Sequence, residues 1–403
     1  MNILFLAHRV PYPPNKGDKI RSFHEIKFLS QRHEIDLVCL ADNNEEAKSH
    51  RELAPYCRSA HVAVLPKYRA NLQAILGLFS HRPLTLSFFF SRKLRAKVTH
   101  LLQQHQYDLI FTYSSSMTQY VEHIQHIPKV VDFVDVDSDK WTQYALHAKF
   151  PYNYVYRSES IRLRNFERAI AQTYQHCFLV SPKEVADFRN LVFPQAMLSS
   201  IQNGIDPDTF QPSLEPYDPD MLVFTGTMDY WANVQTMLYF AREILPLIQR
   251  SIPNVKLYIV GSNPSKEVRR LAEQHANISI TGYVDQVQPY VVKSAVFVAP
   301  MQIGRGINNK ILEAMAMGVP VITSSLGFEG KIIATPGEDL FVEDRPDCFA
   351  KQVINLLTDS TLRKRVSINA RKVILENYDW DKNLEKLEQI LLEVKLTKGR
   401  AET

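Results

Sequence analysis

Glycines and charged side chains lie close together in residues 304–313, around the start of a predicted helix. Gly304 and Gly306 permit a tight turn. A helical pattern of apolar residues begins at Asn308 or Asn309. A glycine-bearing loop that leads into a helix presents unpaired backbone N–H groups and the positive end of the helix dipole. Such a place favours a diphosphate.

Three charged side chains of the same segment suit the binding of a phosphorylated sugar. Arg305 and Lys310 add positive charge, and Glu313 lies one turn into the helix. There its carboxylate could accept hydrogen bonds from sugar or ribose hydroxyls. The alternative is an ordinary strand–helix–strand unit with solvated charges, and the spacing alone does not decide between the two.

Apolar runs on both sides predict the elements that position this segment. Ala295–Ala299 ends at Pro300 and is typical of a buried parallel strand, and Val319–Ile322 predicts a second one. Gly318 and the following Pro320 end the helix between them. The order strand, loop, helix, strand predicts a βαβ unit.

A second glycine loop follows the apolar N-terminal run Ile3–Ala7. This loop contains Gly17 and leads into a helix predicted from about Lys19 to Gln31. In an open α/β sheet, such a loop is where a ligand binds. The pattern GxGxxG is absent, so no dinucleotide site is indicated. A positively charged surface loop is the alternative.

Carboxylates follow another predicted strand, Val130–Val134, and three interpretations of them remain open. Asp135 and Asp137 could bind a metal ion as a DxD pair. Asp137 or Ser138 could cap the helix that follows. Asp135 could also orient or deprotonate an acceptor hydroxyl, provided that burial raises its pKa.

The second half of the chain opens with the same order of elements in residues 221–236, MLVFTGTMDYWANVQT. Gly226 and Thr227 open the glycine loop, which is a natural phosphate edge for a second α/β domain. Further along, a turn after the predicted strand Ile278–Thr281 carries Tyr283 and Val284. A plain turn at the end of a strand is the alternative there.

The composition is that of a soluble globular protein, with 45% hydrophobic and 22% charged residues. At 403 residues, the chain is long enough for two α/β domains. The cysteines are scattered without a CxxC pair, which predicts reduced thiols and a cytoplasmic compartment. No apolar run reaches the roughly 18–20 residues of a transmembrane helix, so any membrane contact should be peripheral.

Basic residues stand beside apolar and aromatic residues in residues 58–97, and no acidic residue lies between Glu52 and Asp108. This pattern suits an anionic membrane surface or a lipid-phosphate acceptor. Nucleic acid is a competing partner for a basic patch, but no nucleic-acid motif accompanies it. A set of core residues with solvated basic neighbours is the remaining alternative.

Two runs resemble a known family. Residues 312–324, LEAMAMGVPVITS, resemble the second half of the Glu-x7-Glu motif of family 4-like glycosyltransferases with the GT-B fold. Glu313 matches the second glutamate, whereas Arg305 stands where the family has the first. Residues 201–212, IQNGIDPDTFQP, resemble the family's NG-V-D-x-x-x-F-x-P signature. Residues 305–321 are most similar to the sugar transferases of bacterial exopolysaccharide and PEP-CTERM/exosortase systems.

This resemblance implies two Rossmann-like domains, each a doubly wound parallel sheet, with a cleft between them. We expect an acceptor-side domain over residues 1–205, a nucleotide-sugar domain over 206–375 and a C-terminal helix over 376–403 that crosses back. The implied reaction is retaining transfer of a sugar from a UDP- or GDP-linked donor to a hydroxyl of a lipid-linked polysaccharide precursor. It needs no metal or other cofactor, and we expect it at the inner face of the plasma membrane.

The resemblance also implies roles for individual residues. Asp135 and Glu313 are the expected catalytic residues, and the acceptor side would use Asp18, Lys19, Arg21 and Asp137. The donor would contact Gly17, Gly226, Thr227, Tyr283, Val284, Arg305, Gly306, Asn309, Lys310 and Glu313.

Family members usually carry an arginine and a lysine after the glycine that matches Gly226, and this chain has Met228 to Trp231 there. Phosphate charge should therefore be met by Arg305 and Lys310. A sugar-nucleotide epimerase of the same fold is one alternative. A catalytically inactive GT-B binding subunit is another, because Arg305 replaces the first glutamate.

Overall fold

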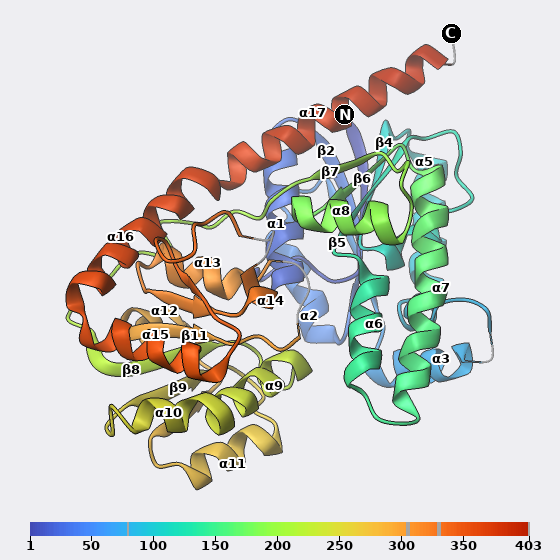
Figure 1. Ribbon diagram of the computed structural model, residues 1–403. Coiled ribbons are helices and arrows are strands. Elements are labelled where there is room, and N and C mark those ends of the chain that lie inside the picture. The colour runs from blue at the N-terminus through green and yellow to red at the C-terminus, as the bar shows by residue number, and fades with distance from the viewer. Residues whose placement is uncertain (79, 304–306, 329–331, 402–403) are drawn as a thin grey trace. The chain divides into compact units, whose positions relative to one another are not determined.

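The computed structural model describes residues 1–78, 80–303, 307–328 and 332–401, and Figure 1 labels its elements. The chain divides into two compact units. The first unit contains residues 1–202 and 381–403, and the second contains residues 203–380. The sequence prediction divides the chain after residues 205 and 375 instead.

The first unit is built on a seven-stranded sheet in which every neighbouring pair of strands is parallel. The strand order is β3-β2-β1-β4-β5-β6-β7. Its strands are β1 (Asn2–Ala7), β2 (Glu34–Ala41), β3 (Ser59–Val64), β4 (Leu109–Tyr113), β5 (Lys129–Val134), β6 (His176–Leu179) and β7 (Leu198–Ser200). The order reverses between β1 and β4, and ligands of open α/β sheets bind at such a reversal.

Apolar side chains on both faces explain why these strands lie in the middle of the unit. β1 and β4 are almost completely buried, as expected for strands covered by helices on both sides. The rings of Phe5 and Phe111 stack with centroids 4.7 Å apart, and Phe111 also stacks with Phe178. The apolar runs of the sequence therefore become the core of the sheet.

The helices of the first unit surround this sheet. They are α1 (Gly17–Leu29), α2 (Asn44–Lys48), α3 (Lys67–Gly77), α4 (Leu84–Phe88), α5 (Arg92–Gln104), α6 (Asp137–His147), α7 (Tyr152–Thr173), α8 (Pro182–Leu191) and α17 (Trp380–Ala401), with 3-10 turns at Ser49–Leu53 and Ser115–Tyr120. Ser181 caps α8, since its side chain accepts a hydrogen bond from the backbone N–H of Glu184.

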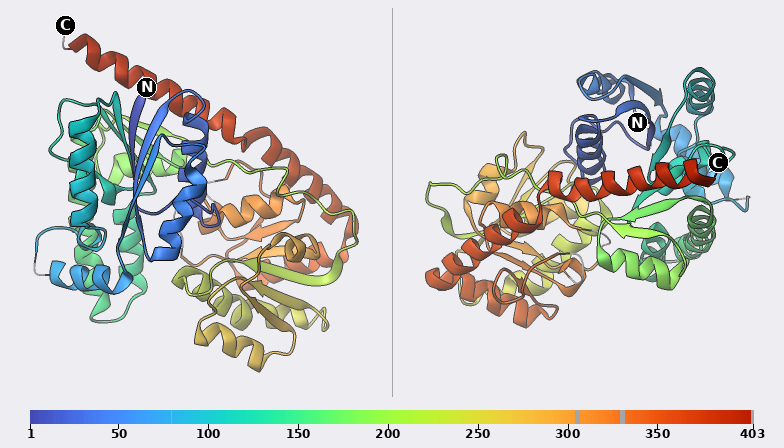
Figure 2. Two further views of the ribbon diagram at one scale, coloured as in Figure 1. Left: turned by 180° about the vertical axis from the view of Figure 1, so that it is seen from behind. Right: turned by 90° about the horizontal axis from the view of Figure 1, so that it is seen from above.

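The C-terminal helix α17 belongs to the first unit and passes close to the N-terminus, as both views in Figure 2 show. Glu388 of α17 contacts the side chains of Arg32 and His33, with 2.9 Å between its Oε1 and Nε2 of His33. Further along, Lys395 contacts Asp108 at 3.0 Å. These ion pairs fasten the last helix to loops that precede β2 and β4.

The second unit is built on a six-stranded sheet, again with only parallel pairs among its neighbours. The strand order is β10-β9-β8-β11-β12-β13, with its reversal between β8 and β11. Its strands are β8 (Asp218–Thr225), β9 (Lys256–Val260), β10 (Ile278–Gly282), β11 (Ser294–Ala299), β12 (Val321–Thr323) and β13 (Phe341–Val342). The predicted fold class, two doubly wound parallel sheets, is confirmed.

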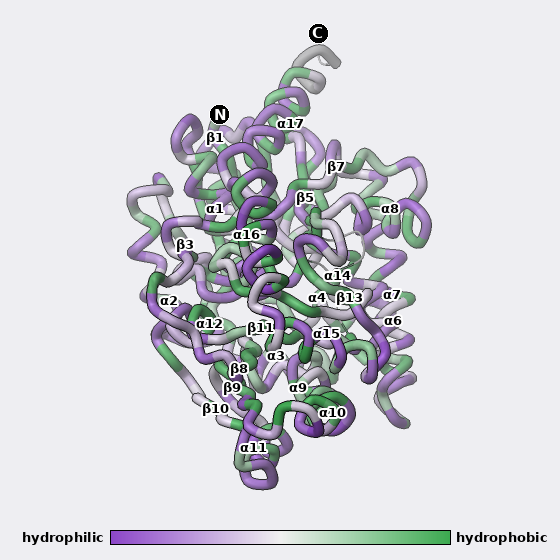
Figure 3. Tube along the Cα trace, turned by 60° about the vertical axis from the view of Figure 1, so that its left-hand side comes forward, coloured by the Kyte–Doolittle hydropathy of each residue, from purple (hydrophilic) through white to green (hydrophobic). Residues whose placement is uncertain are grey.

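The longer helices of the second unit bury an apolar face. They are α9 (Trp231–Tyr239), α10 (Leu245–Gln249), α11 (Lys266–Gln274), α12 (Gln288–Val292), α13 (Asn309–Ala316), α14 (Ser325–Phe328), α15 (Pro346–Thr358) and α16 (Ser360–Asn377), with a π-helical turn at Phe240–Ile244. In α15, for example, Phe349, Val353 and Leu356 recur at helical spacing and are buried. Hydrophobic and hydrophilic stretches along these helices can be followed in Figure 3.

The contacts of Glu388 predict how firmly α17 is held. Glu388→Ala should lower the free energy needed to detach α17 from the first unit by about 1.5–3 kcal/mol. Hydrogen bonds to charged groups contribute that much. Hydrogen exchange in residues 381–397 should become faster in this variant. Glu385→Ala removes an exposed carboxylate from the same helix and should leave exchange unchanged. Equal exchange in the two variants would contradict the assignment.

Candidate functional site

Two glycines hold the ends of β8 and β9 together in the second unit. Gly226 and Gly261 both have φ of +151°, a backbone conformation that side chains disfavour. A Cβ atom on Gly261 would lie 1.8 Å from the carbonyl oxygen of Gly226. The backbone N–H of Gly226 donates to the carbonyl of Val260 at 3.0 Å. The two loops therefore meet backbone to backbone at the carboxyl edge of the sheet, beside the β8–β11 reversal.

The ammonium group of Lys310 lies against this glycine turn. Its Nζ donates to Oδ1 of Asn233 at 2.7 Å and lies 4.3 Å from the centroid of the Phe224 ring. A Cβ atom on Gly226 would lie only 2.9 Å from the same Nζ. Asn233 in turn donates from Nδ2 to the carbonyl of Thr227 at 2.9 Å. The start of α13 is thereby joined to the loop after β8.

The first residue of α13 is held by a second amide contact. Nδ2 of Asn203 donates to Oδ1 of Asn309 at 2.9 Å, and Asn203 is buried. Asn203 belongs to the NG signature predicted from the sequence, so that signature supports the start of α13. Within the described part of the chain, Nδ2 of Asn308 is buried and has no hydrogen-bond partner. A hydrogen-bond donor is thus left over at the N-terminus of this helix.

Burial perturbs two titratable groups near the start of α13, Lys310 and Glu313. It lowers the pKa of Lys310 to about 7, although the charge of Glu313 acts in the opposite direction. It likewise raises the pKa of Glu313 to about 7, against the effect of Lys310. An anion beside Lys310 would favour its charged ammonium form.

Tyr283 and Val284 lie at the same carboxyl edge, after the end of β10. Gly282 turns the chain there with φ of +70°. The ring of Tyr283 is exposed, whereas Val284 packs against the core. Tyr283 is therefore open to stacking by a flat ligand. Arg305 and Gly306 lie outside the described residues.

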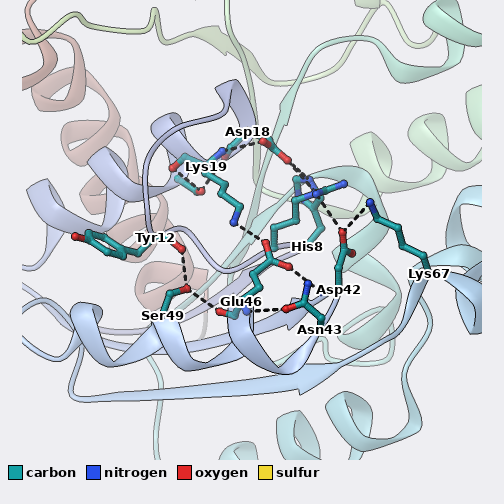
Figure 4. Close-up of polar contacts among 11 residues, drawn as sticks. His8, Tyr12, Asp18, Lys19, Asp42, Asn43, Glu46, Ser49 and Lys67 are labelled. Atoms are coloured by element: carbon teal, nitrogen blue, oxygen red, sulfur yellow. Dashed lines mark hydrogen bonds and ion pairs between the residues drawn. The ribbon is translucent and has the colours of Figure 1, made fainter. Parts of the chain in front are cut away.

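In the first unit, the charges at the start of α1 are neutralised by neighbours, as Figure 4 shows. The Asp18 carboxylate lies 3.4 Å from Nε2 of His8 and 3.1 Å from Nε of Arg9. Burial acts to raise the pKa of Asp18, but the hydrogen bond and charge of His8, with Arg9, hold it well below its usual range. Lys19 pairs with Glu46 at 2.5 Å. Gly17, the first residue of α1, is exposed.

Arg21 is fully buried, which speaks against the expected acceptor contact. Its Nε donates to Oδ2 of Asp132 at 2.6 Å, and its Nη1 donates to the carbonyl of Ile201 at 2.7 Å. Glu25 lies 3.3 Å away on the next turn of α1. The guanidinium therefore joins α1 to β5 and to the segment after β7, and we assign it a structural role.

The end of β5, where the predicted acceptor carboxylates begin, is a strained turn. Val134 has φ of +68°, which a β-branched residue rarely adopts. Oδ1 of Asp132 accepts a hydrogen bond from the Val134 N–H at 2.8 Å. Asp135 and Asp137 follow directly, both half-buried, and Oδ2 of Asp137 accepts from Ser115 at 3.1 Å. The turn thus directs these carboxylates to the carboxyl ends of β4 and β5.

The expectation that Asp137 or Ser138 caps the following helix is wrong. The N-cap of α6 is Val136, which lacks a capping side chain. Glu184 of α8 accepts from the backbone N–H of Val136 at 2.9 Å, and Glu167 of α7 accepts from that of Ser138 at 3.0 Å. Carboxylates distant in the sequence thus occupy amides at the start of α6.

Sequence reasoning missed Asn233 and His8. Both follow a strand of a doubly wound sheet closely, which was the available signal. The His8 ring stacks on Tyr113 with centroids 5.7 Å apart.

Among the residues that the structure describes, no group of three or more His, Cys, Asp or Glu side chains is placed to hold a metal ion. Across the same residues, no helix has both the length and the apolar character to span a bilayer.

Comparison with known proteins identifies the second unit. Residues 219–359 match the family model described as Glycosyl transferases group 1. This chain is a glycosyltransferase. The match includes β8, α13 and the glycine turn described above, so the candidate site lies within the family's own domain.

Relatives of this glycosyltransferase cover most of its length. An uncharacterized 44.6 kDa protein in the cps region of Klebsiella pneumoniae is 22% identical over 394 residues, which are 94% of this chain and 96% of that protein. The UDP-Gal:alpha-D-GlcNAc-diphosphoundecaprenol alpha-1,3-galactosyltransferase of Escherichia coli is 22% identical over 317 residues, 74% of this chain and 78% of that protein.

A solved structure supports the fold. Sucrose-phosphate synthase from Thermosynechococcus elongatus is similar with a TM-score of 0.74 at 16% identity, over 98% of this chain and 100% of that one. The expected GT-B fold of the glycosyltransferase is confirmed.

The contact between the two glycine loops predicts a clear effect of substitution. In Gly261→Ala the new methyl group would clash with the Gly226 carbonyl, so the loops must separate and the melting temperature should fall by an amount corresponding to about 1–3 kcal/mol. Gly337→Ala is the matched control. Gly337 also has positive φ, +85°, but an added methyl group meets nothing within 4 Å. If both variants lose the same stability, the clash is not what matters.

Proposed function

We propose that this glycosyltransferase moves a sugar from a UDP- or GDP-linked donor to a hydroxyl of a lipid-linked polysaccharide precursor. The observation that carries the proposal is the position of the Lys310 ammonium, against the side-chain-free turn at Gly226 and at the start of α13. A cation, unpaired helix N–H groups and a backbone without side chains suit the approach of a diphosphate.

The donor would lie along the carboxyl edge of the second sheet. Lys310 and the N–H groups at Asn309 would meet the diphosphate, together with the backbone at Gly226 and Thr227. Glu313 would accept hydrogen bonds from sugar hydroxyls, and the exposed ring of Tyr283, with Val284, would contact the base. Arg305, Gly306 and Gly17 remain proposed donor contacts on the strength of the sequence.

On the acceptor side, we assign the central role to Asp135. The strained turn at Val134 supports this assignment, because strained backbone clusters at functional sites. Asp135 would orient the acceptor hydroxyl, aided by Asp137 in the first turn of α6 and Asp18 in the first turn of α1. The Lys19 ammonium already pairs with Glu46, so Lys19 would contact the acceptor only as a member of that ion pair.

In the proposed reaction, the bond between the anomeric carbon and the diphosphate oxygen breaks, and a bond to the acceptor oxygen forms. The acceptor hydroxyl loses its proton, and the negative charge of the leaving diphosphate grows. Lys310 and the helix N–H groups would stabilise that charge. We propose that they do so without a metal ion, and that the anomeric configuration is retained, as the family resemblance implies.

The setting of the reaction is part of the proposal. The Escherichia coli relative is named for a diphosphoundecaprenol acceptor, which supports a lipid-linked acceptor here. The cps-region relative and the resemblance of residues 305–321 support a role in exopolysaccharide synthesis. All four cysteines are free, which supports the cytoplasmic compartment.

A panel of nucleotide sugars tests the proposal. Ligands that bind only the folded protein raise its melting temperature, so thermal shift should select one UDP- or GDP-sugar. That donor, incubated with a polyprenyl-diphosphate sugar, should give a glycosylated lipid and free nucleotide. An altered nucleotide sugar formed without acceptor would mean an epimerase. Donor binding without hydrolysis or transfer to any acceptor would mean a binding subunit.

Lys310 should be decisive for donor binding. Lys310→Met removes the cation from the glycine turn and should weaken UDP or GDP binding at least about tenfold, since a charge-assisted hydrogen bond contributes about 1.5–3 kcal/mol. Calorimetry measures this change. Lys351→Met, on the exposed face of α15 in the same unit, should bind as the unmodified chain does. Unchanged affinity in Lys310→Met would remove Lys310 from the site.

The perturbed pKa values predict a pH dependence of binding. The pKa of Lys310 is about 7 and that of Glu313 is about 7. Below that pH Lys310 is charged and Glu313 is neutral, which favours binding of a diphosphate. Above that pH Lys310 loses its positive charge and Glu313 gains a negative one, and both changes oppose binding. The deprotonation of Lys310 alone should therefore lower the affinity for UDP or GDP by up to about tenfold per pH unit above pH 7, with proton uptake on binding. Lys310→Met should flatten most of this dependence, and a flat profile in the unmodified chain would contradict it.

A further inference from the structure

Large apolar side chains are exposed on two parts of the first unit that lie far apart in the sequence. On α3 they are Leu72, Ile75 and Leu76, each more than half exposed. At the tip of the α6–α7 hairpin they include Leu146 and Phe150, both 79% exposed. Water-exposed apolar groups of this size are costly unless they meet a partner. We call these residues, with the basic residues named below, the α3–hairpin surface.

Hydrogen bonds from α7 fasten the two parts of this surface to each other. Arg162 of α7 donates to the carbonyl of Gly77, at the end of α3, over 3.3 Å and to that of Leu78 over 3.4 Å. The buried carboxylate of Glu159 accepts from the backbone N–H groups of Leu84 and Thr85 at 2.6 and 2.8 Å. Figure 1 shows α3 and the hairpin tip at the same end of the unit. The exposed apolar residues of α3 and of the hairpin tip therefore lie at the same end of the unit, on elements that are joined to each other.

The charge of the α3–hairpin surface is positive. No acidic residue lies between Glu52 and Asp108, and none lies between Asp139 and Glu159. Glu159 itself is buried. Exposed basic residues on or beside α3 and the hairpin include Lys67, Arg69, Arg82, Lys149 and Arg157. Of these, Lys67 lies 3.5 Å from Asp42 and Arg82 lies 3.6 Å from Glu122, so Arg69, Lys149 and Arg157 carry most of the positive charge. Two acid-free stretches thus form one surface, although the sequence predicts membrane contact only for residues 58–97.

Aromatic rings form the base of the hairpin tip. Trp141 and Tyr156 lie with ring centroids 5.3 Å apart, and Phe150 meets Tyr154 edge-on at 6.0 Å. Tyrosine and tryptophan are enriched where membranes meet water, because an apolar ring and a polar group suit that boundary. Apolar tips, an aromatic base and surrounding cations are the composition of an interfacial membrane contact.

We propose that the α3–hairpin surface docks the first unit on an anionic lipid bilayer. Phe150, Leu146 and the apolar face of α3 insert between headgroups, and the basic residues contact lipid phosphates. A second copy of the chain fits this surface less well, because two positive surfaces would face each other. A nucleic acid would leave the apolar side chains without a partner. The inference goes beyond sugar transfer, since docking needs neither donor nor acceptor.

Flotation of the full chain with vesicles, without any nucleotide sugar, tests this proposal. The chain should float with vesicles that contain phosphatidylglycerol, less with phosphatidylcholine alone, and less at high salt. Leu72→Glu and Phe150→Glu should each reduce bound protein at least about tenfold. Leu214→Glu introduces the same charge at a fully exposed position of the second unit and should bind normally. Unchanged melting temperatures in all three variants keep the comparison valid.

Three results would overturn the proposal. The first is no flotation with anionic vesicles at low salt. The second is flotation that Leu72→Glu and Phe150→Glu leave intact. The third is a dimer in gel filtration that both substitutions dissociate, which would make the surface a self-association site. Lys149→Gln combined with Arg157→Gln should weaken binding to anionic vesicles and leave binding to phosphatidylcholine unchanged.

Discussion

The buried ion pair of Arg21 and Asp132 organises the end of the first sheet where the proposed acceptor carboxylates lie. Arg21 reaches from α1 to β5 and also bonds the carbonyl of Ile201. Asp132 in turn holds the N–H of Val134 and thereby the left-handed turn that precedes Asp135. Burial and the charge of Asp132 raise the pKa of Glu25 well above its usual range, which favours its neutral form. The cation Arg21 then faces one anion, Asp132. Removing either partner would leave a buried charge uncompensated, which is strongly destabilising.

The second unit positions its site by the absence of side chains. Gly226 and Gly261 bring two loops into backbone contact, and the space left beside Gly226 admits the ammonium of Lys310. That ammonium is held by the amide of Asn233 and the face of Phe224, and the charge of Glu313 also acts on it. In the first unit, by contrast, the guanidinium of Arg21 meets the carboxylate of Asp132 directly. A direct ion pair suits a structural role, whereas a cation held by an amide and a ring suits the proposed anion site.

The sequence is sufficient to predict the elements but not the long-range partners. Apolar runs predict the strands, and Gly318 with φ of +68° ends α13 where expected. Local patterns cannot show that Arg21 pairs with Asp132, because the two residues meet only once α1 packs on the sheet. The same reason explains why the predicted N-cap of α6 is wrong. Its amides bind Glu184 and Glu167, which topology brings from α8 and α7. Asn233 carries no signal beyond its place after a glycine loop.

The contacts of Lys310 also bear on the replacement of the family's first glutamate by Arg305. In the family the cations follow the glycine that matches Gly226, and here that loop has Met228 to Trp231 instead. Lys310 reaches the glycine turn from α13, since its Nζ lies 2.9 Å from where a Gly226 side chain would begin. A diphosphate needs positive charge at the turn, whichever element supplies it. An arginine at position 305, on the same segment, adds cationic charge where the family has an anion. We therefore infer that the cationic function has moved from the β8 loop to the segment before and within α13, which accounts for both departures from the family pattern by one change.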